Sequence, residues 1–277
     1  MSKPGAQEYY DGWIQLLANM GVDFIKVDDI VTHPDEIAGV VKAIENVGRP
    51  IVLSLSPGDR VLGTEIDLYE KADMMRVTSD VWDTQHDLDE CFDAWLTWQY
   101  VPVRKGFWLD MDMIPFGELQ VMSPEWTKVK LAGEGKQRFD RFTVPQKESF
   151  MAMRALSASP LMMGGRLSTL DDVSLRLLTN KQMIACNQNG KMGHLVTNRK
   201  YIQIWITEKQ GTSKNEGWIG VFNRSGEPNI AQIAVARLGL DPDKSYDLHD
   251  IWADKALTLG DHEIDPRGCL FIRYQEK

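Results

Sequence analysis

The sequence has little cysteine, no long hydrophobic run and no excess of positive charge. Its cysteines, Cys91, Cys186 and Cys269, lie far apart and form no CxxC motif, so we expect buried thiols and no disulfide framework. No apolar run approaches the length that spans a bilayer, so we expect no membrane partner. The formal net charge of −9 leaves no basic stripe to neutralise phosphates, which argues against nucleic acid as a partner.

Several sequence motifs are also missing. There is no G-x-S-x-G motif for an acyl-transfer nucleophile, and Gly164-Gly165 lacks the G-x-G-x-x-G context of a phosphate-binding loop and indicates a turn. Residues 1–7 contain no signal-peptide core, so we expect that the printed chain encodes no export signal, and we assign no compartment. With 277 residues and 43% hydrophobic content, the chain has room for a large core and two domains.

Three apolar segments with the character of buried strands end on carboxylates. The segments and their acids are 21–27 with Asp28 and Asp29, 72–77 with Asp80, and 106–109 with Asp110 and Asp112. A parallel α/β barrel presents catalytic side chains in this way, at the carboxyl ends of its strands. An Asp at such a position can also cap the following helix, and for any single acid this alternative stays open.

Amphipathic stretches separate these segments. Residues 35–46 and 88–98 carry apolar side chains at helical spacing, and we expect further helices at 147–157 and 171–178. The expected strands in this half of the chain are 24–27, 51–55, 74–77, 106–109 and 161–163. Strands that alternate with helices through short turns predict a parallel sheet with helices outside it.

Two further regions complete the predicted organisation. The long segment 115–143 follows the third acid-ending strand, and we expect an ordered site loop there. The aromatic anchors of this loop would be Phe116, Trp126, Phe139 and Phe142. Beyond residue 179 the pattern changes to β-rich runs, at 201–206, 218–222, 230–235 and 270–273, separated by Gly, Asn and Asp turns. We therefore expect two domains, residues 1–180 and an antiparallel sheet domain at 181–277.

The motifs, taken in order, resemble those of glycoside hydrolase family 27, the retaining α-galactosidases and α-N-acetylgalactosaminidases. The matching segments are Gly21 to Asp28, Arg76-Val77-Thr78-Ser79-Asp80, Trp108-Leu109-Asp110-Met111-Asp112-Met113, Ser159-Pro160-Leu161-Met162 and Asn187-Gln188. The first segment resembles the family's nucleophile strand, the second its Arg-x-x-x-Asp segment, and the third its Trp-Asn-Asp-Pro-Asp-Met strand end. The fourth resembles the last barrel strand, and the fifth resembles the entry to the C-terminal sheet. Leu109 and Met111 depart from the third motif.

The resemblance implies a partial (β/α)8 TIM barrel, strands four to eight, followed by an antiparallel β-sandwich. It also implies retaining hydrolysis of terminal α-linked galactose or N-acetylgalactosamine, with Asp28 as nucleophile and Asp80 as acid/base. Nothing in residues 1–19 supplies the first three barrel strands, so the chain is expected to be a fragment of a longer enzyme. The alternatives are a truncated non-catalytic or carbohydrate-binding chain, or a related activity such as isomalto-dextranase or β-L-arabinopyranosidase.

Five further residues are expected to contact the substrate. Arg76 would orient sugar hydroxyls or hold a neighbouring acid. By resemblance, Asp112 would accept from one hydroxyl and Met113 would form an apolar wall, with Asp110 alternatively in a supporting role. Lys26 shares a strand face with Asp28 and would help to keep it ionised, unless it forms only a structural salt bridge. Ser56 lies where the N-acetylgalactosaminidases carry a Ser and the galactosidases a Glu, although Pro57-Gly58 departs from the family's Trp-Pro.

The expected ligand set is a small-molecule or oligosaccharide substrate, with no metal and no organic cofactor. A divalent cation at Asp28, Asp29, Asp110, Asp112 and His33 is the weighed alternative, since hard cations prefer oxygen ligands. Lys26 and Arg76 would put positive charge in the same place, which disfavours a metal there. The sequence indicates no oligomeric state.

Overall fold

The structure is a computed structural model that describes residues 1–30, 33–119, 138–212 and 214–277. The chain divides into two compact units, residues 1–80 with 101–112 and residues 81–100 with 113–277. The predicted domain boundary at residue 180 falls inside the second unit and stays a prediction. Each unit is described by itself below.

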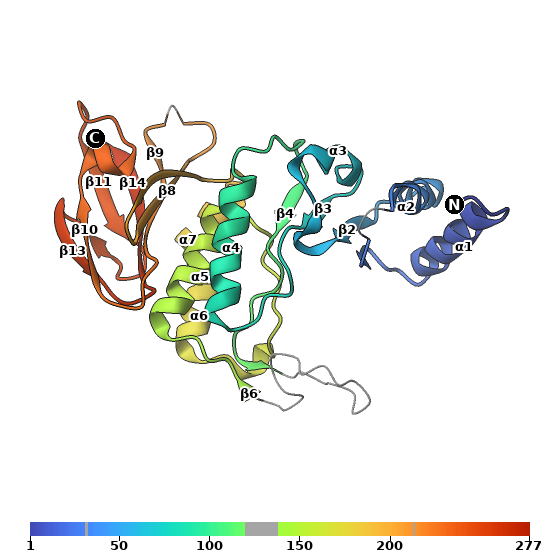
Figure 1. The fold of residues 1–277 in the computed structure, drawn as a ribbon, viewed down its shortest axis with the longest axis horizontal. Helices are drawn as coiled ribbons and strands as arrows, with labels where there is room; N and C mark the ends of the chain where they lie inside the picture. Colours follow the sequence, from blue (N-terminus) through green and yellow to red (C-terminus); the bar gives the residue numbers. More distant parts are fainter. Residues whose placement is uncertain (31–32, 120–137, 213) are drawn as a thin grey trace. The chain divides into compact units, whose positions relative to one another are not determined.

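The first unit contains a four-stranded parallel sheet in the order β1-β2-β3-β4 (Figure 1). Its strands are β1 (Phe24–Asp28), β2 (Val52–Ser56), β3 (Met74–Arg76) and β4 (Trp108–Asp110). Its helices are α1 (Ala6–Asn19), α2 (Pro34–Asn46), η1 (Gly58–Arg60), η2 (Gly63–Glu65) and α3 (Ile66–Tyr69). Helix α2 begins with a proline, which fits the first turn because its missing N–H has no partner to lose there.

Apolar periodicity explains how these elements pack. Ile14 of α1 and Ile37, Val40 and Ala43 of α2 are buried, and the two helices contact each other. Ile37, Val40 and Ala43 recur at the three-residue spacing that gathers apolar side chains on one helix face. The expected helix at 35–46 and the expected strands at 24–27, 51–55, 74–77 and 106–109 are confirmed, with ends shifted by at most two residues.

The second unit begins with α4 and continues through a helical cluster into β-structure (Figure 1). Its first elements are α4 (Gln85–Trp98), β5 (Glu118–Leu119), β6 (Arg138–Phe139), α5 (Val144–Leu156), η3 (Leu167–Thr169), α6 (Asp172–Leu178) and α7 (Lys181–Gln188). Side-chain caps from Thr84, Thr143, Asp171 and Asn180 begin the four α-helices, each satisfying a backbone N–H that the helix itself leaves free. The expected helices at 88–98, 147–157 and 171–178 are confirmed.

The C-terminal part forms two antiparallel sheets that face a common core. Six strands pair in the order β12-β11-β14-β9-β8-β7, and β10 pairs with β13. The bounds are β7 (His194–Arg199), β8 (Ile202–Glu208), β9 (Glu216–Asn223), β10 (Asn229–Ile233), η4 (Val235–Leu238), β11 (Tyr246–Asp250), β12 (Lys255–Ala256), β13 (Gly260–Ile264) and β14 (Cys269–Glu276). Ile204, Ile219, Ile233 and Ile272 belong to the core between the sheets. The predicted partial barrel with a C-terminal antiparallel sandwich is thus confirmed.

The outer face of the six-stranded sheet packs against the helices. The Trp95 ring of α4 stacks on Trp205 of β8, with ring centroids 3.8 Å apart, and the indole N–H of Trp95 donates to the Gly193 carbonyl at 2.8 Å. Both indoles are fully buried, as is Phe150 of α5. Trp95 therefore belongs to the core of this unit and presents no surface to a ligand.

Two expectations need correction or fall outside the described residues. The expected strand at 161–163 is wrong: Met163 forms a single parallel bridge with Ile114. Pro160, which has no N–H, and Gly164-Gly165 flank this short run, so it can extend no ladder. Of the expected loop at 115–143, residues 120–137 with Trp126 lie outside the described residues, whereas Phe116 and Phe142 are buried and Phe139 is exposed. No described helix combines the length and apolarity needed to cross a membrane.

Candidate active site

The candidate site is built on the carboxyl ends of the four parallel strands in the first unit. The register pairs Asp28 at the end of β1 with Ser56 at the end of β2. It also pairs Arg76 at the end of β3 with Asp110 at the end of β4. Because all four strands run in the same direction, these chain positions meet at one edge of the sheet.

Arg76 connects two of the predicted acids. Its Nη1 donates to Asp80 Oδ1 at 2.7 Å and lies 3.8 Å from Asp112 Oδ1. The guanidinium is largely buried, whereas the Asp80 side chain is 70% exposed. A fixed guanidinium that holds an exposed carboxylate orients that carboxylate while leaving its second oxygen accessible.

Lys26 and Asp28 form the second charged pair of the site. They lie two residues apart on β1 and so share one face of the sheet, with Lys26 Nζ 3.7 Å from Asp28 Oδ1. The Asp28 side chain is 67% exposed, so its carboxylate is open to a ligand. The ion pair expected between these two residues is present, and it is compatible with both the catalytic and the purely structural interpretation of Lys26.

Ser56 lies beside these charges but is buried. It is 1% exposed, and its Oγ has no hydrogen-bond partner among the described residues. Its neighbour Gly58 has φ +75°, and a Cβ built there would lie 3.7 Å from Arg76 Nη2. Glycine at 58 therefore allows the left-handed turn after β2, whereas a Cβ there would make only an ordinary contact with Arg76. The sequence analysis noted that Pro57-Gly58 departs from the family motif but did not predict the turn. A Pro-Gly dipeptide directly after a strand is a turn signal that could have predicted it.

The segment after β4 positions Asp112. The backbone N–H of Asp112 donates to Asp110 Oδ1 at 2.9 Å, and Asp112 has φ +67°. Asp29, directly after β1, also has a positive φ of 52°. Non-glycine residues in this left-handed region store strain and gather at functional sites. Asp110 is 5% exposed, and its hydrogen bond to the Asp112 backbone is compatible with the supporting role that the sequence left open for it.

The structure brings six of the seven predicted site residues into the first unit. The six are Lys26, Asp28, Ser56, Arg76, Asp80 and Asp112. Met113 belongs to the second unit, where its carbonyl accepts from Arg154 Nη2 at 3.1 Å and its side chain lies against Gly164.

The described residues contain one group of three acids or histidines close enough to share a metal ion, namely His86, Asp87 and Glu90 on α4. This group is distinct from the acids that the sequence singled out as a weighed metal site. Its Asp87 already accepts from Thr84 Oγ1 at 2.6 Å as part of the α4 cap. The chemistry available at the strand ends is therefore that of carboxylates flanked by cations, suited to proton transfer and nucleophilic attack.

Comparison with known proteins adds family evidence to this geometry. Residues 200–274 match the alpha galactosidase C-terminal beta sandwich domain. A crystal structure of a GH27 β-L-arabinopyranosidase from Geobacillus stearothermophilus superimposes with a TM-score of 0.87 and 33% identity, covering 99% of this chain and 62% of that one. Alpha-galactosidase 2 of Arabidopsis thaliana is 25% identical over 96% of this chain and 63% of its own length. Alpha-N-acetylgalactosaminidase of Gallus gallus is 25% identical over 92% and 63%.

The matches extend along almost the whole chain, from the parallel sheet through the sandwich. The chain spans about three fifths of the length of these relatives. The order of the sequence motifs, the match to the C-terminal beta sandwich domain and the similarity in structure agree with one another. Together these findings support membership of glycoside hydrolase family 27, the α-galactosidase family.

Proposed function

We propose that the protein is a retaining glycoside hydrolase that removes terminal α-linked galactose or N-acetylgalactosamine. The observation that carries the proposal is the pair of exposed carboxylates, Asp28 and Asp80, each beside its own cation at the strand ends of one parallel sheet. Two carboxylates are what a double displacement at an anomeric carbon requires. The similarity to glycoside hydrolase family 27 supports the same reaction.

In the proposed first step, Asp28 attacks the anomeric carbon and the bond from that carbon to the leaving oxygen breaks. Asp80 gives its proton to the leaving oxygen, so the aglycone departs as an alcohol. In the second step Asp80, now a carboxylate, takes a proton from water, whose oxygen attacks the same carbon and releases Asp28. Two inversions restore the original anomeric configuration.

The remaining predicted residues have positioning roles in this proposal. Lys26 stabilises the ionised form of Asp28 and donates to a sugar hydroxyl. Arg76 holds Asp80 by a 2.7 Å hydrogen bond, and Asp112 accepts from a sugar hydroxyl next to it. Met113 is proposed as an apolar wall for the sugar ring, a role inferred from the family motif alone.

Ser56 is proposed to contribute to the choice of sugar. Its small side chain is buried at the strand end beside Asp28, and its Oγ retains an unused hydrogen-bonding capacity. A serine leaves more volume for an acetamido group than a glutamate would, whereas glutamate would accept from a 2-hydroxyl. Replacement Ser56→Glu is therefore expected to shift preference from the N-acetylgalactosaminide toward the galactoside.

A second candidate substrate is a β-L-arabinopyranoside. The observation that favours it is the 33% identity to the Geobacillus stearothermophilus β-L-arabinopyranosidase over nearly the whole chain, against 25% to the two curated glycosidases above. L-Arabinopyranose has the ring hydroxyl configuration of D-galactose but lacks the hydroxymethyl group. Side chains that accept one of these sugars therefore need only a change in volume to prefer the other.

The test is hydrolysis of three p-nitrophenyl glycosides, the α-galactoside, the α-N-acetylgalactosaminide and the β-L-arabinopyranoside. The printed chain is assayed beside a version extended upstream by family barrel strands one to three, with Asp28→Asn and Asp80→Asn variants of each. Release of nitrophenol that Asp28→Asn abolishes and Asp80→Asn strongly slows supports the proposal, and the preferred glycoside identifies the sugar. A folded, extended protein that leaves all three intact contradicts it and favours the non-catalytic, carbohydrate-binding alternative.

A further inference from the structure

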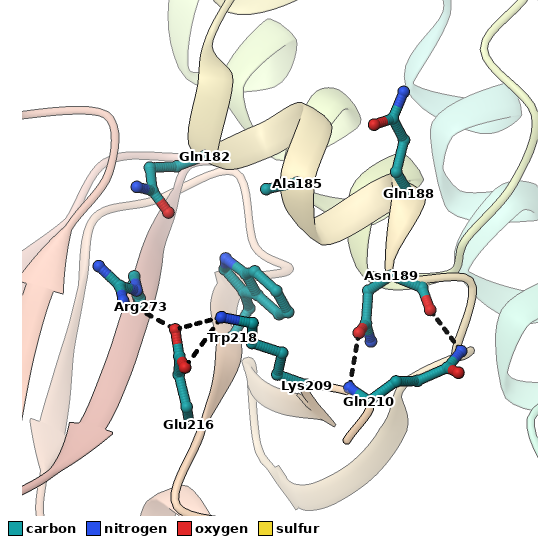
Figure 2. A pocket seen from close by; sticks show the side chains of 9 residues that line it. All are labelled: Gln182, Ala185, Gln188, Asn189, Lys209, Gln210, Glu216, Trp218 and Arg273. Carbon is teal, nitrogen blue, oxygen red and sulfur yellow. Dashed lines mark hydrogen bonds and ion pairs between the residues drawn. The ribbon is translucent and has the colours of Figure 1, made fainter. Parts of the chain in front are cut away.

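A pocket of about 530 Å³ lies in the second unit, and no residue of the candidate active site lines it (Figure 2). It is bounded by α7 on one side and by β9, β14 and the turn after β8 on the other. Its lining combines amide side chains, a small apolar surface at Ala185 and Trp218, and the charged residues Lys209, Glu216 and Arg273. Amides beside a tryptophan form a lining that can meet both hydroxyl groups and an apolar sugar face.

The charged residues leave an excess of positive charge in this pocket. Arg273 Nη2 donates to Glu216 Oε1 at 2.7 Å, and Lys209 Nζ lies 3.0 Å from both Glu216 oxygens. Burial alone would raise the pKa of Glu216, but the hydrogen bonds from Arg273 and Lys209 outweigh it and the pKa is lowered. One ionised carboxylate is thus shared by two cations, whose side chains remain 34% and 44% exposed.

The groups left available in the pocket wall are mainly donors. Arg273 Nη2 donates to Glu216 Oε1 at 2.7 Å and to Gln275 Oε1 at 3.5 Å, which leaves Nε and Nη1 without an acceptor among the described residues. The indole Nε1 of Trp218, which is 3% exposed, also has no acceptor in the described chain and adds partial positive charge to the wall. The oxygens of Glu216 are already occupied by Arg273 and Lys209. A complementary ligand must therefore bring acceptors and negative charge.

Other residues give the pocket a fixed shape. Asn189 Oδ1 accepts from the Gln210 backbone at 2.8 Å, and Asn189 Nδ2 donates to the Glu208 carbonyl at 3.0 Å, so this end is held rigidly (Figure 2). Gln182, on α7, lies on the same side of the Trp218 indole as Arg273, and its amide has no partner within the described residues (Figure 2). A rigid wall with free donors at one end lowers the entropic cost of binding.

We propose that this pocket binds a carboxylate-bearing pyranose, a uronic acid, with the carboxylate at Arg273 and Lys209 and ring hydroxyls at Gln182. The anionic part of the inference rests on the charges and donors of the pocket. The choice of a sugar acid over other carboxylates rests on the proposed glycosidase function. The pocket would thus hold an acidic residue of a glycan independently of bond cleavage at Asp28 and Asp80.

The test is ligand-observed NMR titration of the protein with D-glucuronate, D-glucose and acetate. The gluco sugars differ from galactose at C4, so binding is measured apart from the proposed galactosidase site. We expect glucuronate to bind about tenfold more tightly than glucose or acetate, since one well-placed charge contributes about 1.4 kcal/mol, and to weaken as salt rises. Glucose or acetate binding as tightly as glucuronate would overturn the proposal.

Two variants and a matched control locate the binding. Arg273→Gln is expected to weaken glucuronate about tenfold, on the basis of the same charge contribution. Lys244→Gln removes another cation of the same unit, one paired with Glu276 at 2.9 Å at a different pocket, and is expected to change nothing. Gln182→Ala, which improves helix propensity, is expected to weaken binding about threefold even if Arg273→Gln fails to fold. Equal losses in Lys244→Gln and Arg273→Gln, or none in Gln182→Ala, would overturn the assignment.

Discussion

Acidic residues beside cations occur in both units, but their environments differ sharply. In the first unit the side chains of Asp28 and Asp80 are 67% and 70% exposed, although each has a cation within 4 Å. In the second unit the side chains of Asp83 and Asp140 are 1% and 4% exposed. Aspartates paired with Lys or Arg therefore lie at a ligand-accessible sheet edge in the first unit and in a buried polar network in the second.

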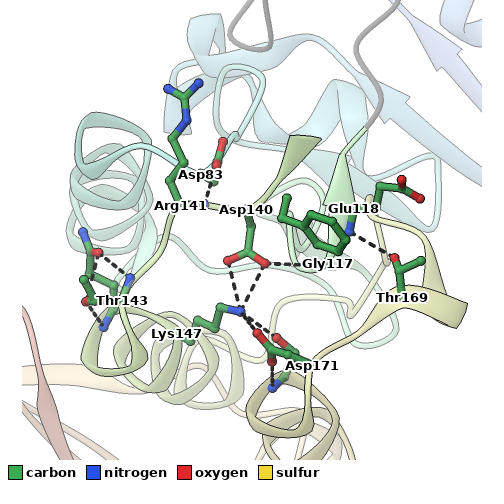
Figure 3. A network of polar contacts seen from close by, with 12 residues as sticks. Asp83, Gly117, Glu118, Asp140, Arg141, Thr143, Lys147, Thr169 and Asp171 are labelled. Atoms are coloured by element: carbon green, nitrogen blue, oxygen red, sulfur yellow. Dashed lines mark hydrogen bonds and ion pairs between the residues drawn. The ribbon is translucent and has the colours of Figure 1, made fainter. Parts of the chain in front are cut away.

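The interior network is centred on Lys147 of α5 (Figure 3). Its Nζ lies 2.7 Å from Asp171 Oδ2, 3.1 Å from Asp140 and 2.9 Å from Ser174 Oγ. Asp140 also accepts from the Gly117 backbone at 2.8 Å. Every donor of the buried ammonium therefore has an acceptor, which is the condition under which a buried charge is tolerated.

Asp83 has a similarly complete set of partners. Arg138 approaches it through both terminal nitrogens at 2.6 Å, and the Arg141 backbone N–H donates to it at 2.8 Å. A carboxylate that is 1% exposed and already accepts three hydrogen bonds is out of reach of a substrate. The contrast teaches that accessibility and incomplete saturation, not the presence of an Asp beside a cation, separate the candidate catalytic acids from the structural ones.

The strongest way to test this contrast is to remove the exposed acids in the active protein. Asp28→Ala should abolish measurable turnover, because no nucleophile remains, and Asp80→Ala should lower kcat about 10²- to 10⁴-fold, the usual contribution of a general acid/base. Steady-state hydrolysis of the preferred p-nitrophenyl glycoside measures both. Asp83→Asn, if folded, should retain kcat, because Asp83 has no substrate-accessible oxygen.

Azide distinguishes the two roles. With Asp28→Ala, azide replaces the nucleophile and gives a product of inverted configuration by a single displacement. With Asp80→Ala, azide attacks the glycosyl-enzyme intermediate and gives a product of retained configuration. Identical products from both variants, or near-full activity in either, would contradict the assignment of nucleophile and acid/base.

The next largest effect is expected at the interior network. Lys147→Met leaves Asp140 buried without its cation, and breaking a buried pair in this way costs about 3–5 kcal/mol. The thermal midpoint should fall by roughly 10 °C for a unit of this size. Adding Asp140→Asn should recover part of the loss, because it removes the uncompensated charge. An unchanged midpoint in Lys147→Met would mean that the network contributes no stability.

A smaller effect is expected from changing the geometry at Arg76 while keeping its charge. Arg76→Lys loses the planar fork that reaches Asp80 and approaches Asp112, so kcat/KM should fall about tenfold. Arg49→Lys is the matched control, since Arg49 pairs with Asp23 at 2.6 Å in the same unit. A control that loses as much activity as Arg76→Lys would point to a general loss of folding instead.

Much of the first unit could be predicted from local pattern. Short apolar runs such as 24–27 gave the strands, and the spacing of Ile37, Val40, Val41 and Ile44 gave the helix, because a face packed against the core imposes its period on the sequence. Acids at three strand ends then indicated the edge where a site would lie. The family motifs added a role to each acid.

Other features depend on contacts that no local pattern contains. The run at 161–163 has the composition of a strand, yet only Met163 finds a bridging partner. Asp83 and Asp80 look alike in the sequence, and only the fold provides Arg138, 55 residues away, to bury one of them. The pocket at Trp218 likewise joins α7 to β9 and β14, which are distant along the chain.

The smallest expected effect tests the exposed margin of the interior network. Burial would raise the pKa of Asp171, but the hydrogen bond from Lys147 outweighs it and lowers the pKa from 3.8 to about 2. Because the pKa in the native state is lower than the ordinary value, the charge stabilises the fold above pH 4, and this contribution is lost as the pH falls toward 2.

Asp171→Asn keeps the cap on Ser174 but removes the charge. With the side chain 56% exposed, solvent screening reduces the expected loss to about 0.5–1 kcal/mol. The measurement is thermal unfolding of both proteins at pH 7, 5, 4 and 3. The difference in unfolding free energy between Asp171→Asn and the unmodified protein should stay constant down to pH 5 and shrink below pH 4. A difference that grows on acidification would show that the charge of Asp171 does not stabilise the network.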